Sequence, residues 1–306
     1  MKFLFIGLGS IARRHISNLK EICPHVLITV LRSGKGKNRF EDFSRLIDKI
    51  VFDASELEAW YDAVFITNPT SMHYETLYKY QEISNYFFIE KPVFQLGTED
   101  ISCFLDSGKT YYVACPLRYT SVIQYVKKHI DFSGIYAIRC ISSSYLPDWR
   151  PGINYRDTYS AHKRLGGGVS IDLIHEWDYI HYLTGAPKEV KCFIRKKSDL
   201  EIDSDDIAVY IAEYEDKIVE LHLDYFGRET IRKIEFFGSE DTIIADLNNQ
   251  QIEWVKQGKK IKFEQERNEF QKRELEHFLD IINDRCDSDN NIKEACEVLR
   301  ITRGIV

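Results

Sequence analysis

Short apolar runs alternate with amphipathic stretches along the first 115 residues. This rhythm of strand, helix, strand, helix is typical of a parallel sheet covered by helices. The predicted strands span Lys2–Ile6, Val26–Leu31, Lys49–Phe52, Ala63–Thr67, Tyr86–Ile89 and Tyr111–Ala114. The predicted helices span Ile11–Ile22, Ser71–Ile83 and Thr98–Ser107. Ser71 and Thr98 would serve as N-caps of the last two helices. The pattern therefore predicts an α/β domain with a doubly wound parallel sheet.

After Pro116 the pattern changes to a helix near Thr120–His129, a strand near Tyr136–Ser144 and a long loop. Short alternating runs then dominate from Lys188 to Ile261, as expected for a mostly antiparallel sheet. They are Val190–Arg195, Ile207–Tyr214, Ile218–Asp224, Ile231–Phe237 and Thr242–Asp246. Two helices, near Asn268–Asn283 and Asn291–Arg303, close the chain. We therefore predict two domains, residues 1–116 and residues 117–306, the second an α+β domain with an open sheet.

The composition agrees with two folded domains. A chain of 306 residues, 44% of them hydrophobic and 29% charged, is longer than one hydrophobic core usually serves. The formal net charge of −7 argues against a nucleic-acid partner, because such a protein normally carries a basic surface.

The cysteines and the N-terminus indicate the compartment. The seven cysteines are scattered and form neither a C-x-x-C motif nor a metal-like pairing, so we expect reduced thiols and no metal. The N-terminal apolar run is broken by Gly7 and Gly9 and ends at Arg13, which favours a buried strand over a signal peptide. No stretch approaches the roughly 20 apolar residues that span a bilayer. These features predict a cytoplasmic protein without a membrane partner.

A glycine turn follows the first strand and consists of Gly7, Leu8, Gly9, Ser10, Ile11 and Ala12. In the pattern G-x-G-x-x-A, Gly7 permits a tight turn, Gly9 admits a pyrophosphate to the backbone and Ala12 allows close helix packing. The helix N-terminus would face the anion. We expect this segment, including Ser10 and Ile11, to bind a dinucleotide; the alternative is a glycine turn of purely structural use.

The end of the second strand bears on the choice of cofactor. An acidic residue there normally binds the ribose of NAD, but this strand ends in Leu31, Arg32 and Ser33. Arg32 and Ser33 could bind a 2′-phosphate, which favours NADP. The basic residues Lys35, Lys37 and Arg39 could assist. NAD remains the alternative, with Arg32 stacked on the adenine.

A lysine follows the fifth predicted strand, where Glu90, Lys91 and Pro92 come directly after an apolar run. Open α/β sheets bind ligands at the carboxyl ends of their strands, so Lys91 is a candidate catalytic cation. Pro92 permits a cis Lys91–Pro92 bond, which would aim the ammonium into a cleft. The alternative is an exposed charged pair at a strand end.

A second candidate cluster follows the glycine run Gly166–Gly168 on a helix that ends near Gly185. Asp172, His175 and Tyr179 would share one face of that helix. A carboxylate beside an imidazole suits proton transfer. The alternatives are an ordinary amphipathic helix and an acidic residue that merely favours a helix N-terminus. A zinc motif would need histidine at position 179, so we expect no metal here.

Together these motifs resemble the Gfo/Idh/MocA oxidoreductase family. The resemblance rests on the glycine turn, on Asn68, Pro69 and His73 after the fourth strand, on Glu90, Lys91 and Pro92, and on the glycine run before Asp172 and His175. It implies a Rossmann domain that binds NAD(P) through these N-terminal motifs, Glu90 and Lys91 included. It also implies a second domain whose open sheet often forms oligomer contacts, here of a homodimer or homotetramer.

Family members usually transfer hydride between NAD(P) and a sugar or cyclitol carbon, and the resemblance assigns the catalytic roles to Lys91, Asp172 and His175. The family typically places the histidine four residues after the aspartate, whereas this sequence has three. Either His175 still faces the nicotinamide, or the acid–base role has moved to a tyrosine such as Tyr119 or Tyr179.

The loop after the seventh predicted strand is rich in aromatic and basic residues. Aromatic faces stack on sugar C–H surfaces, and arginine binds carboxylate or phosphate with two hydrogen bonds. The predicted substrate-binding residues are Arg118, Tyr119, Trp149, Arg150, Tyr155, Tyr159 and Tyr179. They suggest an acidic, amino or nucleotide-linked sugar of surface carbohydrate metabolism. The alternative is a polar surface loop held in place by its aromatic residues.

The function predicted from the sequence is an NAD(P)-dependent oxidoreductase acting on a secondary alcohol or ketone of a sugar derivative, with NADP favoured and NAD possible. One alternative is a non-catalytic sensor that binds nucleotide and sugar. Another is a glycosidase that oxidises its substrate transiently and regenerates NAD.

Overall fold

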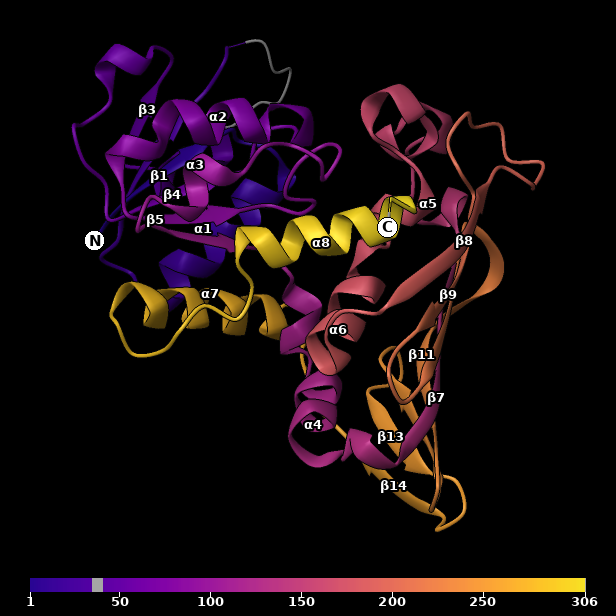
Figure 1. The fold of residues 1–306 in the computed structure, drawn as a ribbon. Helices are drawn as coiled ribbons and strands as arrows, with labels where there is room; N and C mark the ends of the chain where they lie inside the picture. Colours follow the sequence, from indigo (N-terminus) through magenta and orange to yellow (C-terminus); the bar gives the residue numbers. More distant parts are fainter. Residues whose placement is uncertain (35–40, 306) are drawn as a thin grey trace. The chain divides into compact units, whose positions relative to one another are not determined.

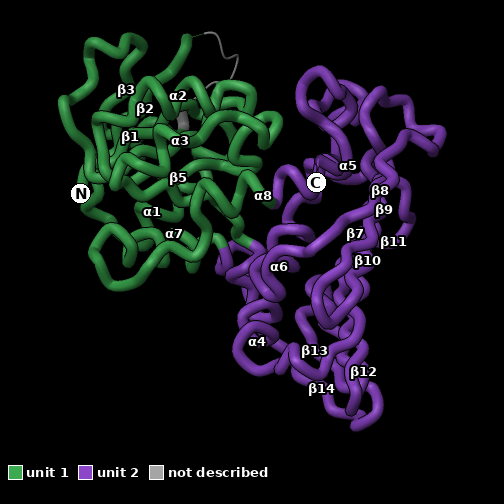
Figure 2. Tube along the Cα trace, viewed as in Figure 1, with its two compact units in different colours: residues 1–116, 271–297 green, residues 117–270, 298–306 purple. Residues whose placement is uncertain are grey.

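The computed structural model describes residues 1–34 and 41–305, and the chain divides into two compact units (Figure 2). The first unit comprises residues 1–116 and 271–297, and the second comprises residues 117–270 and 298–306. The predicted division placed all of 117–306 in one domain. The structure differs because residues 271–297 contribute Leu275, Phe278 and Leu279 to the core of the first unit.

The first unit is built on a parallel sheet of six strands, which confirms the predicted fold class. The strands are β1 (Lys2–Ile6), β2 (Leu27–Leu31), β3 (Lys49–Val51), β4 (Ala63–Ile66), β5 (Tyr86–Ile89) and β6 (Thr110–Val113). Their order is β3-β2-β1-β4-β5-β6, and every neighbouring pair is parallel. All four residues of β4 are buried, as expected for a strand covered on both faces.

Helices cover both faces of this sheet (Figure 1). They are α1 (Ser10–Ile22), α2 (His73–Tyr80), α3 (Ser102–Leu105), α7 (Glu269–Ile282) and the first part of α8 (Ile292–Arg303). Helices α1 and α7 pack on the same face, where the Phe278 ring lies 5.6 Å from Phe65 and 5.2 Å from Phe88. The amphipathic pattern of each helix supplies this apolar stripe.

The predicted N-caps Ser71 and Thr98 are wrong. Helix α2 begins at His73, after a 3-10 turn over Thr70–Met72, and α3 begins only at Ser102. The segment before α3 forms turns because nearby carboxylates accept its backbone N–H groups: Glu99 accepts from Leu96 and Gly97, and Asp100 accepts from Ser102.

The second unit contains a mostly antiparallel sheet of eight strands. They are β7 (Ile135–Tyr145), β8 (Glu189–Arg195), β9 (Ile207–Glu213), β10 (Ile218–Asp224), β11 (Phe226–Gly238), β12 (Thr242–Asp246), β13 (Gln251–Trp254) and β14 (Lys259–Lys262). The order is β14-β13-β12-β11-β7-β10-β9-β8, and only β7 and β10 pair in parallel. The sequence pattern missed β13 and β14, which form one edge of the sheet.

Helices cover one face of this second sheet. They are α4 (Ser121–His129), α5 (Val169–Asp172) and α6 (Ile174–Thr184) (Figure 1). Helix α4 begins after Thr120, whose hydroxyl accepts the Ile123 N–H. The opposite face exposes apolar side chains such as Phe193, which is 70% exposed. In the described part of the chain no helix is long and apolar enough to cross a bilayer.

Candidate active site

The glycine turn at the carboxyl end of β1 has the geometry of a dinucleotide-binding turn. Gly7 has φ of 99°, and a Cβ there would lie 2.9 Å from the Asn68 Cα, so only glycine fits. Gly9 stands at the N-cap of α1, and a Cβ added to it would meet no atom within 4 Å. The first turn of α1, which includes Ser10 and Ile11, carries no acidic residue. This helix end is therefore open and electrostatically suited to an anion.

Arg32 and Ser33 lie at the carboxyl end of β2, on the same edge of the sheet. The Arg32 N–H donates to the Val51 carbonyl at 2.9 Å, which fixes the backbone beside β3. The Arg32 guanidinium lies 6.0 Å from the ring centre of Phe52, and that ring is 58% exposed. A guanidinium group and an exposed aromatic ring therefore lie close together at this strand end. The basic residues Lys35, Lys37 and Arg39 lie outside the described residues.

Lys91 emerges at the end of β5 beside a histidine–carboxylate pair in which the histidine is buried and the carboxylate is partly buried. The Lys91–Pro92 peptide bond is cis, the isomer considered from the sequence. The Glu90 carboxylate accepts a hydrogen bond from its neighbour, the Lys91 N–H, at 3.2 Å. Its other oxygen lies 2.5 Å from Nε2 of His15 on α1. The sequence analysis did not assign His15 to the site.

The contact with His15 keeps the Glu90 carboxyl, which lies next to Lys91, in its charged form. Burial would raise the pKa of Glu90, but the hydrogen bond and charge of His15 and the charge of Lys91 outweigh burial and lower it. In the described part of the chain, Nδ1 of His15 has no hydrogen-bond partner. The Nε2 atom therefore carries the proton shared with the carboxylate. Glu90 is thus an anion whose orientation depends on His15.

Asn68, Pro69 and His73 lie between β4 and α2 on the same sheet edge. His73 is buried, and its ring nitrogens lie 2.9 Å from the Asn68 carbonyl and 3.1 Å from the Val93 carbonyl. Burial lowers the pKa of His73. The Asn68 amide donates to the Thr76 hydroxyl at 2.7 Å. His73 therefore connects the loop after β4 to the loop that follows Lys91.

The glycine run of the second unit leads into two short helices instead of one. Helix α5 ends at Asp172, and Leu173 breaks the helical path with φ of −99° and ψ of 30° before α6 begins at Ile174. The predicted continuous helix through Asp172, His175 and Tyr179 is therefore corrected. The three residues do not share one regular helix face, because the break lies between Asp172 and His175.

Asp172 is buried, 6% exposed, and is held by tyrosine. The Tyr225 hydroxyl donates to its carboxylate at 2.6 Å, and burial and the charge of Asp172 raise the pKa of the Tyr159 hydroxyl. Burial, the charge of Asp172 and this hydrogen bond all raise the pKa of Tyr225 well above its usual value. The nearby carboxyl of Asp205 accepts the Ser170 N–H at 2.9 Å, and burial raises its pKa. Asp172 thus sits in a compact group of tyrosines and carboxyls.

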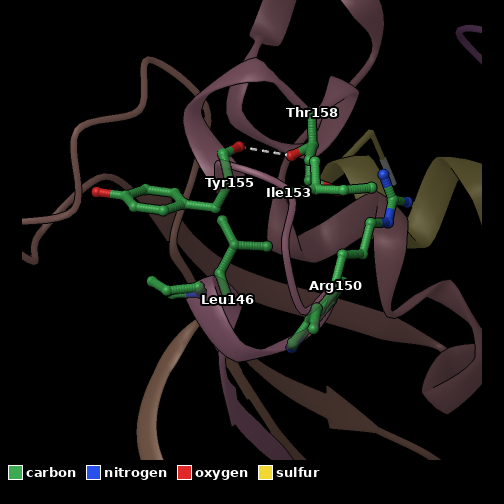
Figure 3. A pocket seen from close by; sticks show the side chains of 8 residues that line it. Leu146, Arg150, Ile153, Tyr155 and Thr158 are labelled. Atoms are coloured by element: carbon green, nitrogen blue, oxygen red, sulfur yellow. Dashed lines mark hydrogen bonds between the residues drawn. The ribbon is translucent and has the colours of Figure 1, made fainter.

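The aromatic and basic loop lines a pocket (Figure 3). The pocket is lined by Leu146, Pro147, Trp149, Arg150, Ile153, Tyr155, Thr158 and Ser160. The Trp149 indole donates to the Ser144 hydroxyl at 2.9 Å and meets the Tyr225 ring edge-on at 5.2 Å. The Arg150 guanidinium lies 5.4 Å from the ring centre of Tyr159. Predicted substrate residues of this loop therefore lie close to Asp172.

Three other predicted substrate residues are interior. Arg118 is 1% exposed, and its guanidinium donates two hydrogen bonds, of 2.8 and 2.6 Å, to the Asp178 carboxylate. Tyr179 is fully buried against Cys140, and burial raises the pKa of its hydroxyl far above the usual value. Tyr119 is also buried. All three therefore lie in the interior of this structure, and their assignment as substrate-binding residues stays a prediction.

Residues 123–244 match the model of the GFO/IDH/MocA C-terminal domain. The matched segment contains the glycine run, Asp172 and the strands β7 to β11 of the second sheet. This segment is therefore a Gfo/Idh/MocA C-terminal domain. The glycine turn and the two-sheet architecture described above are the features that the resemblance implied for the whole chain.

The relatives that this chain resembles in sequence are distant. It is 27% identical over 189 residues to the uncharacterized oxidoreductase YrbE of Bacillus subtilis (strain 168), covering 59% of this chain and 53%, about half, of that relative. It is 24% identical over 268 residues to the myo-inositol 2-dehydrogenase of Thermotoga maritima, covering 80% of this chain and 75% of the enzyme.

Solved structures share the fold. One is the WlbA dehydrogenase from Bordetella pertussis in complex with NADH and UDP-GlcNAcA, with a TM-score of 0.80 and 16% identity. The superposition covers 100% of this chain and 95% of WlbA, and at this identity it shows the fold alone.

Sequence reasoning missed His15 and Tyr225, although each contacts a residue that it selected, and it missed Asp205, which accepts the N–H of Ser170 next to the glycine run. His15 lies three residues after Ala12 on α1, on the buried side of the helix. Its position in an apolar stripe was the available signal, because a buried histidine normally has a polar partner. Tyr225 and Asp205 gave no comparable signal.

Proposed function

We propose that this chain is an NAD(P)-dependent oxidoreductase that transfers hydride to or from a secondary alcohol or ketone of a sugar derivative. The observation that carries the proposal is the shared edge of the first sheet. There the open N-terminus of α1, with Gly9 free of steric hindrance, lies at the same strand ends as Lys91. An anion-binding turn suits the cofactor, and a lysine at the same edge of the sheet suits the substrate oxygen.

The cofactor fits the residues present: the Gly7–Ala12 turn would hold its pyrophosphate, and Arg32 with Ser33 its adenosine ribose. Bound there, NAD(P) supplies the hydride acceptor or donor. During oxidation the substrate C–H bond breaks with its electron pair, the oxygen forms a carbonyl and the hydroxyl proton leaves. The Lys91 ammonium stabilises the negative charge that develops on that oxygen, and the group of Asp172 and His175 receives the proton.

We further propose that the substrate is an acidic, amino or nucleotide-linked sugar. The pocket of the second unit offers Trp149 as an aromatic surface and Arg150 as a cation (Figure 3). Such a pair suits a sugar ring that carries an anionic group. The WlbA structure, which holds UDP-GlcNAcA, supports this class as the first to test. The open sheet face with Phe193 would form the contacts of a homodimer or homotetramer.

The decisive experiment follows cofactor absorbance while acidic, amino and nucleotide-linked sugars are screened with NAD and NADP. A dehydrogenase gives a stoichiometric absorbance change with its substrate. A sensor or a transiently oxidising glycosidase gives no net change, and only the glycosidase releases sugar. Absence of net change across the screen, with tight binding of nucleotide and sugar, would favour the sensor.

Arg32 is expected to confer a preference for NADPH. Its guanidinium stands beside the exposed Phe52 ring, where a 2′-phosphate gains a charged fork. Arg32→Ala should weaken NADPH binding about tenfold and leave NADH binding within about twofold, since a hydrogen bond to a charged group contributes roughly 1.5–3 kcal/mol. Fluorescence titration of each cofactor measures this. Arg285→Ala, at an exposed guanidinium of the same unit, is the control. A wild-type protein that prefers NADH would refute the argument.

His15 is expected to act through Glu90. His15→Leu would remove the hydrogen-bond donor from the partly buried Glu90 carboxylate, whose other oxygen accepts the Lys91 N–H. We expect kcat to fall about tenfold with little change in KM, because a small displacement of a catalytic group is costly. His15→Gln, which restores a donor, should recover most of the rate. His25→Leu removes an exposed histidine and serves as the control. Equal rates for the Leu and Gln variants would contradict this role.

A further inference from the structure

Glu176 is an interior carboxylate that is bound on one side only. It stands in the first turn of α6 and is 0% exposed. Its Oε1 atom accepts the Nε–H of Arg232, on β11, at 2.7 Å. Its Oε2 atom is buried and has no hydrogen-bond partner within residues 1–34 and 41–305. A carboxylate in the interior is costly unless a cation compensates it. The contact with Arg232 supplies this cation and fixes the Nε edge of the guanidinium.

The far edge of the same guanidinium is open. The Arg232 side chain is 25% exposed, whereas its partner is completely covered. Among the residues that the structure describes, Glu176 is the one hydrogen-bond partner of this side chain, and it binds at Nε. The two Nη nitrogens are therefore left to solvent or to a ligand. An arginine held in this way presents two parallel N–H groups, which match the two oxygens of a carboxylate.

Arg232 lies on the face of the second sheet that the helices cover. Side chains alternate between the faces of a strand, so Arg232 shares a face with Ile234 and Phe236, both of which are fully buried. Glu176 reaches Arg232 from α6, which covers this face. In the register of the sheet, Arg232 stands opposite Ser142 of β7. The guanidinium therefore lies at the rim of the covered face and not on the open face.

Asp172 approaches the same face from the other side of β7. Its carboxylate binds the hydroxyl of Tyr225, which follows β10 and, by continuing the parallel register, lies beside Ser144. Ser144 is two residues beyond Ser142. With a rise of about 3.3 Å per residue and about 4.8 Å between strands, the Cα atoms of Arg232 and Tyr225 lie about 12 Å apart. Because both side chains are long, one sugar ring with its substituents can reach from Asp172 to the guanidinium.

We propose that Arg232 is a substrate-binding residue that recognises a carboxylate on the sugar, and that Glu176 is the residue that positions its guanidinium. The inference rests on the proposed oxidoreductase function and narrows its substrate class to sugar acids. The pair of Glu176 and Arg232 has no net charge, so it suits the single charge of a carboxylate better than a diphosphate. The recognised group lies across the ring from the reacting oxygen. Arg232 therefore contributes to binding and not to hydride transfer.

The test uses acidic sugars with matched neutral counterparts. The probes are glucuronate and galacturonate, free and UDP-linked, each compared with glucose or galactose in the same form. Isothermal titration calorimetry measures their affinities, so this readout does not depend on turnover. We expect wild-type protein to bind at least one acid about tenfold or more tightly than its neutral counterpart. The UDP-linked pairs separate recognition of the sugar carboxylate from recognition of the diphosphate, which both members of a pair carry.

Two variants remove the recognition without leaving one charge alone in the interior. Arg232→Lys keeps a cation beside Glu176 but loses the two-pronged geometry, and it should weaken binding of the acid about tenfold. Arg232→Met combined with Glu176→Leu removes both charges and should weaken it about 30-fold, as for lost hydrogen bonds to a charged group. Binding of the neutral counterpart should stay within about threefold in both variants. Arg139→Met, at a half-exposed arginine on the opposite face of β7, should leave every affinity unchanged.

The role of Glu176 is tested by rescue. Glu176→Leu leaves the guanidinium without its anchor and should reduce the preference for the acid over the neutral sugar about fivefold. Glu176→Gln, whose amide oxygen still accepts the Nε–H, should restore most of that preference. A merely structural role would lower the melting temperature of the Leu variant and leave the ratio of the two affinities unchanged.

Steady-state kinetics add a second readout. For an acidic substrate, Arg232→Lys should raise KM about tenfold with kcat within about threefold, because the contact is the same in ground state and transition state. Equal losses for acid and neutral counterpart, or for both members of a UDP-linked pair, would overturn the carboxylate assignment. So would a wild-type protein that turns over cofactor but prefers the neutral sugars, although the oxidoreductase function would then stand. Preference for the acid in calorimetry without net cofactor turnover on any sugar would overturn the oxidoreductase function and leave the binding role of Arg232 in place.

Discussion

Lys91→Met is expected to lower kcat by about 1,000-fold, the upper range for removing one donor that stabilises a developing oxyanion. Methionine keeps the length and apolar stem of lysine but removes the charge. The Glu90–His15 pair and the backbone N–H of position 91 remain, so the loop should keep its shape. Cofactor affinity should stay within about twofold, because the pyrophosphate would bind at the Gly7–Ala12 turn.

Steady-state turnover and fluorescence titration of NAD(P)H separate the two effects. Lys79→Met, at an exposed lysine on α2 of the same unit, should retain full activity and serves as the matched control. Turnover close to wild type in Lys91→Met would remove Lys91 from the mechanism. Loss of cofactor binding in that variant would instead assign the lysine a binding role.

Arg118→Met is expected to destabilise the second unit by about 3–5 kcal/mol, the range for breaking one partner out of a buried ion pair. The guanidinium and Asp178 share two hydrogen bonds and are both almost fully buried. Without Arg118 the Asp178 carboxylate is a buried charge with its partner removed. The Tyr182 ring, 4.8 Å from the guanidinium, also loses its cationic neighbour.

Thermal and urea unfolding of the full chain measure this effect. Replacing both partners, as in Arg118→Met with Asp178→Leu, should recover most of the stability, because no charge is then left in the interior. Arg139→Met provides the exposed comparison: Arg139 lies 3.3 Å from both Glu220 and Glu235 and is half exposed, so its loss should cost less than about 1 kcal/mol. Equal destabilisation by Arg118→Met and Arg139→Met would contradict the interior role of Arg118.

The parts of the fold that could be predicted from the sequence are those with strong local signals. The buried apolar runs located β1 and β5 to the residue, because both faces of these strands are covered. The edge strands β13 and β14 escaped notice because lysines and polar residues interrupt their alternation. Such charged edges are common, since they discourage pairing with other chains.

The residues of the candidate site also include some with a strong local sequence signal and some without one. Gly7 and Lys91 were identifiable because each belongs to a short motif of consecutive residues. Gly7, which has a positive φ, belongs to the glycine turn, and Lys91 precedes a proline. The contacts of His15 with Glu90 and of Tyr225 with Asp172 join residues 75 and 53 positions apart. Only the assembled strand order brings them together. The break at Leu173 also has no local sign, since leucine favours helices.

Because residues 271–297 belong to the first unit, a single cut in the chain cannot separate the two units. A polypeptide cut after Pro116 would contain all six parallel strands and the whole glycine turn, yet Phe65, Phe88 and Tyr112 would lose the ring of Phe278 that packs against them. The first unit is therefore not a separable N-terminal segment. A transplantable version would need the α7 segment joined to residue 116 by a new linker.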